Sequence, residues 1–369
     1  MTTVFEDVKK VITETLNQIG IHIFSLEPYG SSINGLALRK DESDLDLSLI
    51  ITNQKGDFCP MEDFDEIFDA IIKQMQQKTY VNEYTKNEMA RYRVHAHSAS
   101  FGRLLTITDV KNYNYKIDIS ANKVLDLYNS HLLRTYALLD QRFHIMALLI
   151  KSWNKKRFPS KIDRLNSYSI VLMLVAFLQH EEILPRLQQM ASDEKIIKYV
   201  KYHQHKESSQ VFHQRVYETN VAFESDVEVI AKKFKNKHLE NKSVGQLLLN
   251  FFEFYTYRFK GASVSEGRTQ VYPAISISHK KSFPLKQDYQ RELSDNQNVQ
   301  QWSQEEWEYF LTKMDDWAFM IVDPFDCTYN PGRQIEVNSQ KLKLFFKNMK
   351  KQLCHMLQTG LFDRSYKQY

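Results

Sequence analysis

Residues 29–50 read YGSSINGLALRKDESDLDLSLI, and the rest of the chain is organised around this stretch. It opens with the small-residue turn Gly30-Ser31-Ser32 and closes with an alternating segment, Asp44 to Ile50. In a strand, side chains two positions apart point to the same face. The alternation therefore predicts a strand on which Asp44 and Asp46 project together, with Leu45, Leu47 and Leu49 on the opposite face.

Two neighbouring carboxylates repel each other and resist desolvation unless a cation lies between them. A pair of Mg²⁺ ions would relieve this repulsion, and two such ions can clamp the attacking and leaving oxygens of a phosphoryl transfer. A lone Asp-x-Asp is more often a polar edge strand with its acids in water. The upstream turn favours chemistry instead, because Gly30 and Ser31 offer backbone N–H groups and a hydroxyl to phosphate oxygens.

Two-metal chemistry needs a third carboxylate on a neighbouring strand. Residues 113–119, YNYKIDI, alternate in the same way and place Lys116 and Asp118 on one face. Asp118 is therefore our candidate for the third acid. Asp109 is the competing candidate, but it falls at an expected turn with Lys111 and Asn112.

Composition sets broad limits on the kind of protein. The chain has 369 residues, enough for about two domains, with 43% hydrophobic residues, 25% charged residues and a net charge of +4. Three distant cysteines, Cys59, Cys327 and Cys354, form neither a zinc motif nor a disulfide framework. No apolar run reaches membrane-spanning length, and the first residues resemble no secretory or transit signal. We expect no membrane association and a cytoplasmic location, with a nuclear one left open.

Hydrophobic periodicity predicts the order of the elements. Helices are expected over residues 3–18 and 64–77, and strands over residues 21–26, 44–50, 91–97 and 113–119. From residue 122 onward the pattern is helical. It includes residues 142–153, the buried helix 170–178 after a cap at Asn166, residues 244–259, and residues 341–357. Residues 181–240 are polar, and residues 260–300 are expected to be loops.

Together these motifs resemble the DNA polymerase β-like nucleotidyltransferases. Within them, the chain is similar to the terminal uridylyltransferases and the GLD-2- and Cid1-type poly(A) or poly(U) polymerases. The Gly-Ser and Asp-x-Asp signature is followed by DISANKVLDLYNSHLL at residues 118–133, KSWNK at residues 151–155 and NSYS at residues 166–169. Residues 245–259 and 322–333 resemble parts of the PAP-associated segment of that family.

The resemblance implies an α+β architecture. A small mixed-sheet catalytic domain over residues 18–121 would face a larger, mainly helical PAP-associated domain, formed by residues 1–17 and 122–369, across a cleft. The implied activity is template-independent addition of uridylates from UTP to the 3′ end of single-stranded RNA. The implied metal ligands for Mg²⁺ or Mn²⁺ are Asp44, Asp46 and Asp118. The implied nucleotide contacts are Gly30, Ser31, Asn129, Lys151, Lys155, Ser167, Tyr168, Asp323, Asp326 and Tyr329.

Three other functions stay open on the sequence. Adenylate addition from ATP is one, because Asp323 and Asp326 could accept hydrogen bonds from uracil N3–H or from the adenine amino group. Tyr329 stands where some relatives carry a uracil-selecting His, and its bulk favours the smaller uracil. A catalytically inactive RNA-binding relative and a metal-dependent glycosyltransferase are the other two. The third acid argues against both, and the Lys-Ser-Tyr set also argues against the glycosyltransferase.

Several positions depart from the family pattern. The gap before Asp44 is slightly long, with Lys40-Asp41-Glu42 as a small insertion. Lys123 and Asp126 replace residues that are usually Asn and small, respectively, and Asp326 is a shorter acid than the usual Glu. We identify no separate RNA-binding domain in the sequence. We therefore expect the cleft, or a partner protein in a larger RNA-processing or small-RNA complex, to hold the RNA.

Overall fold

The computed structural model describes residues 2–38, 44–82, 84–99, 102–112, 115–205, 208–234, 242–259, 273–336 and 339–359. The chain divides into two compact units. The sheet unit comprises Met1–Arg134 and Ile196–Thr219, and the helical unit comprises Thr135–Lys195 and Asn220–Tyr369. The inserted segment Lys40-Asp41-Glu42 lies outside the described residues.

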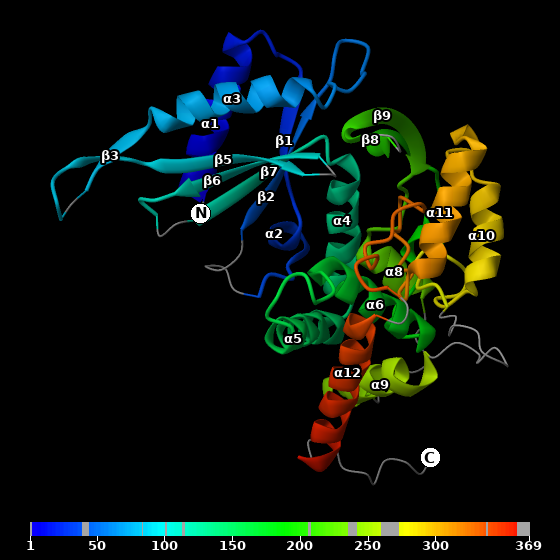
Figure 1. Ribbon diagram of the computed structural model, residues 1–369. Helices are drawn as coiled ribbons and strands as arrows, with labels where there is room; N and C mark the ends of the chain where they lie inside the picture. Colours follow the sequence, from blue (N-terminus) through cyan, green and yellow to red (C-terminus); the bar gives the residue numbers. More distant parts are fainter. Residues whose placement is uncertain are drawn as a thin grey trace. The chain divides into compact units, whose positions relative to one another are not determined.

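A five-stranded mixed sheet forms the centre of the sheet unit (Figure 1). Its strands, in spatial order, are β1 (Phe24–Tyr29), β2 (Leu45–Ile51), β7 (Tyr115–Ala121), β6 (Gly102–Asp109) and β5 (Tyr92–Ala99). β2 and β7 run parallel, whereas every other neighbouring pair is antiparallel. The expected mixed sheet is confirmed, and β6 is a strand that the sequence pattern did not reveal.

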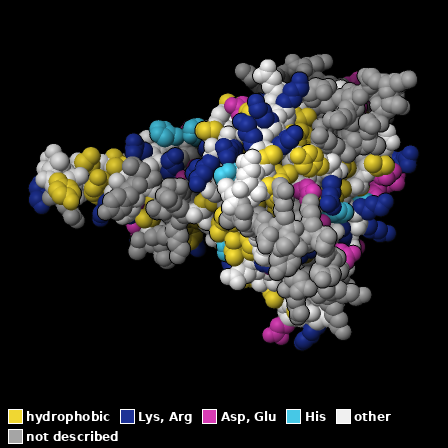
Figure 2. Space-filling model, turned by 90° about the horizontal axis from the view of Figure 1, so that it is seen from below, with side chains coloured by type: hydrophobic (Ala, Val, Ile, Leu, Met, Phe, Trp, Pro, Cys, Tyr) yellow, Lys and Arg dark blue, Asp and Glu magenta, His cyan; other side chains and the backbone are white. Residues whose placement is uncertain are grey.

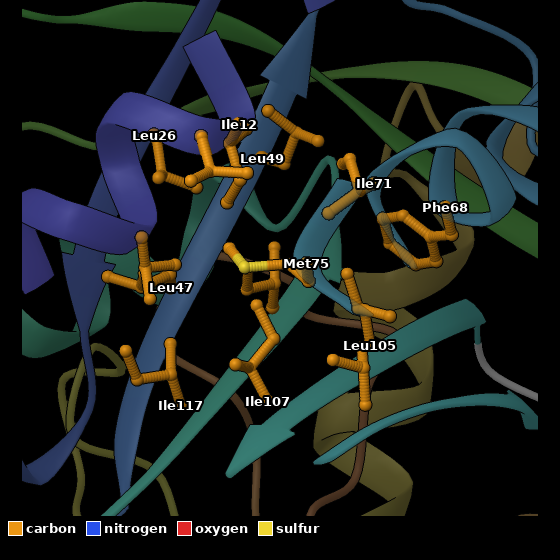
Figure 3. Close-up of a cluster of buried hydrophobic side chains, with 14 of the residues drawn as sticks. Ile12, Leu26, Leu47, Leu49, Phe68, Ile71, Met75, Leu105, Ile107 and Ile117 are labelled. Carbon is orange, nitrogen blue, oxygen red and sulfur yellow. The ribbon is translucent and has the colours of Figure 1, made fainter. Parts of the chain in front are cut away.

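One face of this sheet is buried against helices α1 (Thr2–Gln18) and α3 (Asp63–Gln76) (Figure 1). Figure 3 shows Leu47 and Leu49 of β2 meeting side chains from both helices. The alternation of β2 explains this packing, because its leucines face the core and Asp46 faces away. We had expected the first helix to join the helical domain. Instead its stripe Val4, Val8, Ile12 and Leu16 is buried in the core beneath the sheet.

Two hairpins complete the sheet unit. The short strands β3 (Thr79–Val81) and β4 (Glu88–Ala90) pair with each other beyond α3. β8 (Ile196–His205) and β9 (Ser208–Asn220) form a two-stranded sheet within the segment that looked merely polar in the sequence. Tyr199 and Tyr217, one from each strand, are buried with ring centroids 5.7 Å apart. Many charged residues hid this strand pair from pattern analysis.

Helix α6 (Ser167–His180) is the buried centre of the helical unit. Every residue from Ser169 to Gln179 is buried, as expected for a helix that is apolar on all sides. Asn166 caps it, and its side chain accepts a 2.7 Å hydrogen bond from Ser169 N. Around it lie α5 (Gln141–Arg157), α9 (Val244–Glu253) and the π-helical turn Phe254–Arg258. Helix α12 (Gln340–Gln358) packs on α9 and on the π-helical turn. Helix α4 (Val124–Leu139) crosses the boundary between the two units.

The remaining elements are short. They are α2 (Ser31–Asn34), α7 (Leu187–Met190), α8 (Val227–Lys233), α10 (Lys286–Ser294), the 3₁₀ turn Val299–Gln301 and α11 (Gln304–Asp316). Helix α10 lies in a region expected to be loop; its Tyr289 and Leu293 pack on Met314 of α11. Within the described residues, no helix has the length and apolarity needed to cross a membrane.

Candidate active site

Two candidate acids lie side by side at one end of the sheet. Asp46 on β2 is the direct register partner of Asp118 on the parallel strand β7. Asp118 is in turn paired with Thr106 of β6, whose hydroxyl donates a 2.7 Å hydrogen bond to Asp118 Oδ1. Asp44 precedes β2 by one residue and is exposed. The parallel pairing of β2 and β7 brings the carboxylates of Asp46 and Asp118 together.

The electrostatics of this pair follow from its position. Burial, together with the charges of Asp118, Asp44 and Asp126, raises the pKa of Asp46 to about 7. The described residues hold no preformed group of three or more His, Cys, Asp or Glu side chains that could bind a metal ion. The donors present are carboxylate oxygens, which are the ligands that Mg²⁺ and Mn²⁺ prefer. The chemistry of this set therefore fits a divalent cation.

Asp109, the competing third acid, lies elsewhere. It ends β6 opposite Tyr115 and is 1% exposed. Its carboxylate accepts hydrogen bonds from Asn112 N at 3.1 Å and Asn112 Nδ2 at 2.9 Å, and lies 3.4 Å from Arg91 Nη2. These contacts fix the turn after β6, whereas Asp118 lies beside Asp46.

Gly30 is the point where the turn approaches the acids. Its φ of 74° lies in the region that favours glycine, and a Cβ there would lie 2.5 Å from Asp46 Oδ2. Its N–H donates a 2.7 Å hydrogen bond to Ser130 Oγ. Gly30 therefore makes room for Asp46 and fixes the turn to α4, while Ser31 begins α2 directly after it.

Helix α4 carries two candidate neighbours of the Gly30 turn. The helix starts at Val124, so Asn129 and Ser130 are buried in its second turn. Ser130 Oγ donates to Asp126 O at 2.6 Å while it accepts from Gly30 N. Asp126, whose pKa burial raises, adds a fourth acid near the site. Ser130, Asp126 and Thr106 are thus site neighbours that the motifs did not reveal.

A second group of candidate residues lies in the helical unit. The Tyr168 hydroxyl donates a 2.8 Å hydrogen bond to Asp323 Oδ2. Next to it, Asn166 Nδ2 donates to Pro331 O at 3.0 Å. These two bonds tie the first turn of α6 to the loop 323–331, and so bring together motifs that are far apart in sequence.

Local hydrogen bonds shape that loop. Asp323 is 3% exposed, and its Oδ1 accepts from Phe325 N and Asp326 N, each at 2.9 Å. Burial and the charge of Asp326 raise the pKa of Asp323 to about 6. Asp326 Oδ1 accepts from Thr328 Oγ1 at 2.7 Å. Tyr329 is half-buried, and the Arg333 guanidinium lies 5.3 Å from the centre of its ring.

The remaining candidates differ in their exposure. Lys151 and Lys155 are one turn apart on α5, but Lys151 is 7% exposed whereas Lys155 is exposed. Burial lowers the pKa of Lys151 to about 8, which leaves it largely charged at neutral pH. Ser167 is exposed at the first position of α6. The described candidate residues thus form two groups, one in each unit.

Residues 2–138 match the family model described as the central palm domain of mitochondrial-like poly(A) RNA polymerase. Among curated proteins, the chain is 25% identical over 260 residues to the poly(A) RNA polymerase gld-2 of Caenorhabditis elegans. That match covers 68% of this chain and 20% of the relative. It is also 25% identical over 320 residues to the terminal uridylyltransferase cid1 of Schizosaccharomyces pombe, with 84% of this chain and 64% of the relative covered. The matches therefore span between a fifth and somewhat under two thirds of these two relatives.

Solved structures share the fold. A crystal structure of the Cid1 poly(U) polymerase aligns with a TM-score of 0.60 at 19% identity, over 95% of this chain and 85% of that chain. The structure of a cytoplasmic RNA terminal U-transferase aligns with a TM-score of 0.63 at 20% identity, over 99% and 88%. The α+β architecture expected from the sequence is confirmed by this similarity.

Proposed function

Because this chain belongs to the DNA polymerase β-like nucleotidyltransferase family, we propose that it adds nucleotides to the 3′ end of RNA without a template. The observation that carries the proposal is the register pairing of Asp46 with Asp118, directly beside the Gly30 turn. In the proposed reaction, the RNA 3′ oxygen forms a bond to the α-phosphorus of a nucleoside triphosphate. The bond from that phosphorus to the β-phosphate breaks, and pyrophosphate leaves.

Asp44, Asp46 and Asp118 are the proposed ligands of Mg²⁺ or Mn²⁺. When bound, the ions would supply positive charge against the charge that develops on the transferred phosphoryl group. Thr106 holds Asp118 in place through its 2.7 Å hydrogen bond. Catalysis of this kind depends on positioning and electrostatics, so no covalent nucleophile is required.

The proposed contacts of the triphosphate are Gly30, Ser31, Lys151, Lys155 and Ser167. Asn129 would contact the ribose, and the Tyr168 ring would stack on the base. Base–aromatic stacking contributes about 1–3 kcal/mol per base.

UTP is the proposed substrate. Uracil presents an N3–H donor, and the carboxylates of Asp323 and Asp326 are acceptors, directly or through one water. Tyr329 has a hydroxyl that could donate to a uracil carbonyl and a bulk that disfavours a purine. The similarity to a terminal uridylyltransferase supports this choice, and the similarity to a poly(A) polymerase supports ATP as the alternative. We further propose a cytoplasmic location, since one structural relative is a cytoplasmic enzyme.

The test is extension of one single-stranded RNA primer with each of the four nucleoside triphosphates and Mg²⁺. A primer with a blocked 3′ oxygen and the variant Asp118→Asn serve as controls. We expect UTP to be incorporated most rapidly, and neither control to be extended. Preferred incorporation of ATP would identify a poly(A) polymerase. No incorporation of any nucleotide would overturn the proposed activity and favour the inactive RNA-binding alternative.

A further inference from the structure

Positive charge is concentrated in two segments of the helical unit. Residues 155–166, at the end of α5 and in the loop after it, hold five Lys or Arg and one Asp. Residues 339–358, which form α12 and its cap, hold five Lys and no acid. Because the whole chain has a net charge of +4, all other residues together carry a net charge of −5. The basic excess of this chain is therefore local.

The two segments pack against each other. Phe345 of α12 stacks on Phe158 with ring centroids 6.2 Å apart, and lies 6.3 Å from the Trp153 ring of α5. Gln334 Nε2, just before α12, donates a hydrogen bond to Arg164 O. The basic residues of the α5 loop and of α12 therefore belong to one surface of the helical unit.

Helix α12 is divided sharply into two faces. Leu342, Phe345 and Met349 are buried, whereas Lys343, Lys347 and Lys350 are exposed along the opposite side. Within the described part of the chain, these three lysines make no ion pair. In the space-filling view from below, Lys and Arg side chains gather over part of the surface (Figure 2).

A hollow of about 730 Å³ lies at the first turns of α12. Lys341, Lys343 and Lys347 line it together with Leu344, which is 43% exposed, and the amides of Gln334 and Gln340. Asp163 and Glu336 also line it, so the hollow combines cations with hydrogen-bond acceptors and donors. Such a mixture suits a ligand that carries both phosphates and polar, partly apolar nucleosides.

We propose that this surface, formed by Lys341, Lys343, Lys347 and Lys350 with Lys161 and Arg164, binds the sugar-phosphate backbone of the RNA upstream of its 3′ end. The inference rests on the proposed function, which makes a polyanion the substrate. Neutralising phosphates with lysines releases condensed counterions and gives binding without sequence preference.

The chain also connects this surface to the proposed nucleotide contacts. The loop that carries Arg164 ends at Asn166, the cap of α6, whose side chain bonds to Pro331 O. The segment that carries Asp323 runs on to Gln334, which lines the hollow. The loop that carries Arg164 and the segment from Asp323 to Gln334 therefore both lead from the basic surface to the proposed nucleotide contacts.

The test compares Lys343→Glu/Lys347→Glu with the control Lys9→Glu/Lys10→Glu. The control changes the net charge equally, at exposed positions on α1. Extension is measured with RNA primers of about 4 and about 24 nucleotides, chosen to bracket typical single-strand site sizes. We expect the α12 variant to raise the KM for the long primer about tenfold and leave its kcat unchanged. The α12 variant with the short primer should show the KM and kcat of the parent protein. The control variant should show the parent's KM and kcat with both primers.

Binding of labelled RNA, followed by fluorescence anisotropy across a salt series, gives a readout that needs no catalysis. For Lys343→Gln/Lys347→Gln, we expect the slope of log K against log salt to fall by about 1.4, because each lost single-strand phosphate contact removes about 0.7. An unchanged slope and long-primer KM would overturn the RNA surface and leave an acidic protein segment as its partner. If the slope changes but no primer is extended, only the proposed activity is overturned.

Discussion

The hydroxyl of Tyr168 donates a 2.8 Å hydrogen bond to Oδ2 of Asp323, although 155 residues separate the two in the chain. The bond fixes the plane of the tyrosine ring against the loop 323–331. A ring that must stack on a base benefits from such positioning, because less side-chain freedom is lost on binding.

The first prediction concerns this bond. Tyr168→Phe keeps the ring and removes the hydroxyl, so we expect the KM for the nucleotide to rise about fivefold, which corresponds to the loss of one hydrogen bond of roughly 1 kcal/mol. Tyr168→Ala also removes the stacking surface, worth about 1–3 kcal/mol, and should raise the KM further. Initial rates over a nucleotide concentration series measure both. Equal effects of the two variants would contradict a stacking role for the ring.

The second prediction separates the two acids that competed in the sequence. Asp118→Asn should abolish extension and leave the thermal unfolding temperature close to that of the parent. Asp109→Asn should retain kcat but lower the free energy of unfolding by about 1–3 kcal/mol, because it weakens the buried hydrogen bonds that order the turn. Activity assays and denaturant unfolding of both variants decide the matter. Loss of activity in folded Asp109→Asn, with activity kept in Asp118→Asn, would exchange their roles.

Sequence patterns recovered the elements whose signal is local. The alternation around Asp46 predicted β2, and the uniformly apolar run after Asn166 predicted the buried α6. What failed depended on long-range packing. The stripe of α1 shows that a helix buries one face, but not which domain it meets. The hydrogen bond that Gly30 N donates to Ser130 Oγ needs the fold, because 100 residues separate the two in the chain.

The third prediction is a pH dependence of stability. Burial and Asp326 raise the pKa of Asp323 from 3.8 to about 6, so the folded state holds this proton more tightly than the unfolded chain does. The stabilisation is complete below pH 3.8 and is lost as pH rises through about 6. The contribution of Asp323 to the free energy of unfolding falls by up to about 3 kcal/mol between these two pH limits. The free energy of unfolding of Asp323→Asn should lack this decline.

The control for this measurement is the difference between parent and variant at each pH, since all other titrating groups contribute to both curves. In Asp323→Asn, the remaining oxygen can still accept from Phe325 N and Asp326 N, so the loop should stay ordered. Urea unfolding between about pH 3 and pH 8 covers the relevant window around both pKa values. Parallel curves over that window would show that Asp323 does not cause the decline.

The fourth prediction concerns nucleotide choice. Tyr329→Ala should increase the ratio of ATP to UTP incorporation, because it removes bulk that we propose excludes the purine. Asp326→Ala should lower the preference for UTP by removing an acceptor for N3–H. Competition between the two labelled nucleotides on one primer measures the ratio directly. Arg333→Ala is a useful companion, since it removes the cation above the Tyr329 ring and retains the ring itself.

The last prediction uses two glycines that share a backbone conformation and differ in their surroundings. Gly30 has a φ of 74° and Gly20 a φ of 83°, so alanine at either position should cost about 1 kcal/mol of stability through backbone strain. Only at Gly30 would the added Cβ meet another group, because it would lie 2.5 Å from Asp46 Oδ2, whereas nothing lies within 4 Å at Gly20.

Gly30→Ala must therefore displace either the turn or the Asp46 carboxylate. We expect extension activity to fall by at least about 100-fold, since a displacement of about 1 Å at a reacting centre can have this effect. Gly20→Ala should lose comparable stability and keep its activity. Urea unfolding and primer extension with both variants give the comparison. Similar activities in the two variants would mean that the approach of Gly30 to Asp46 has no part in the reaction.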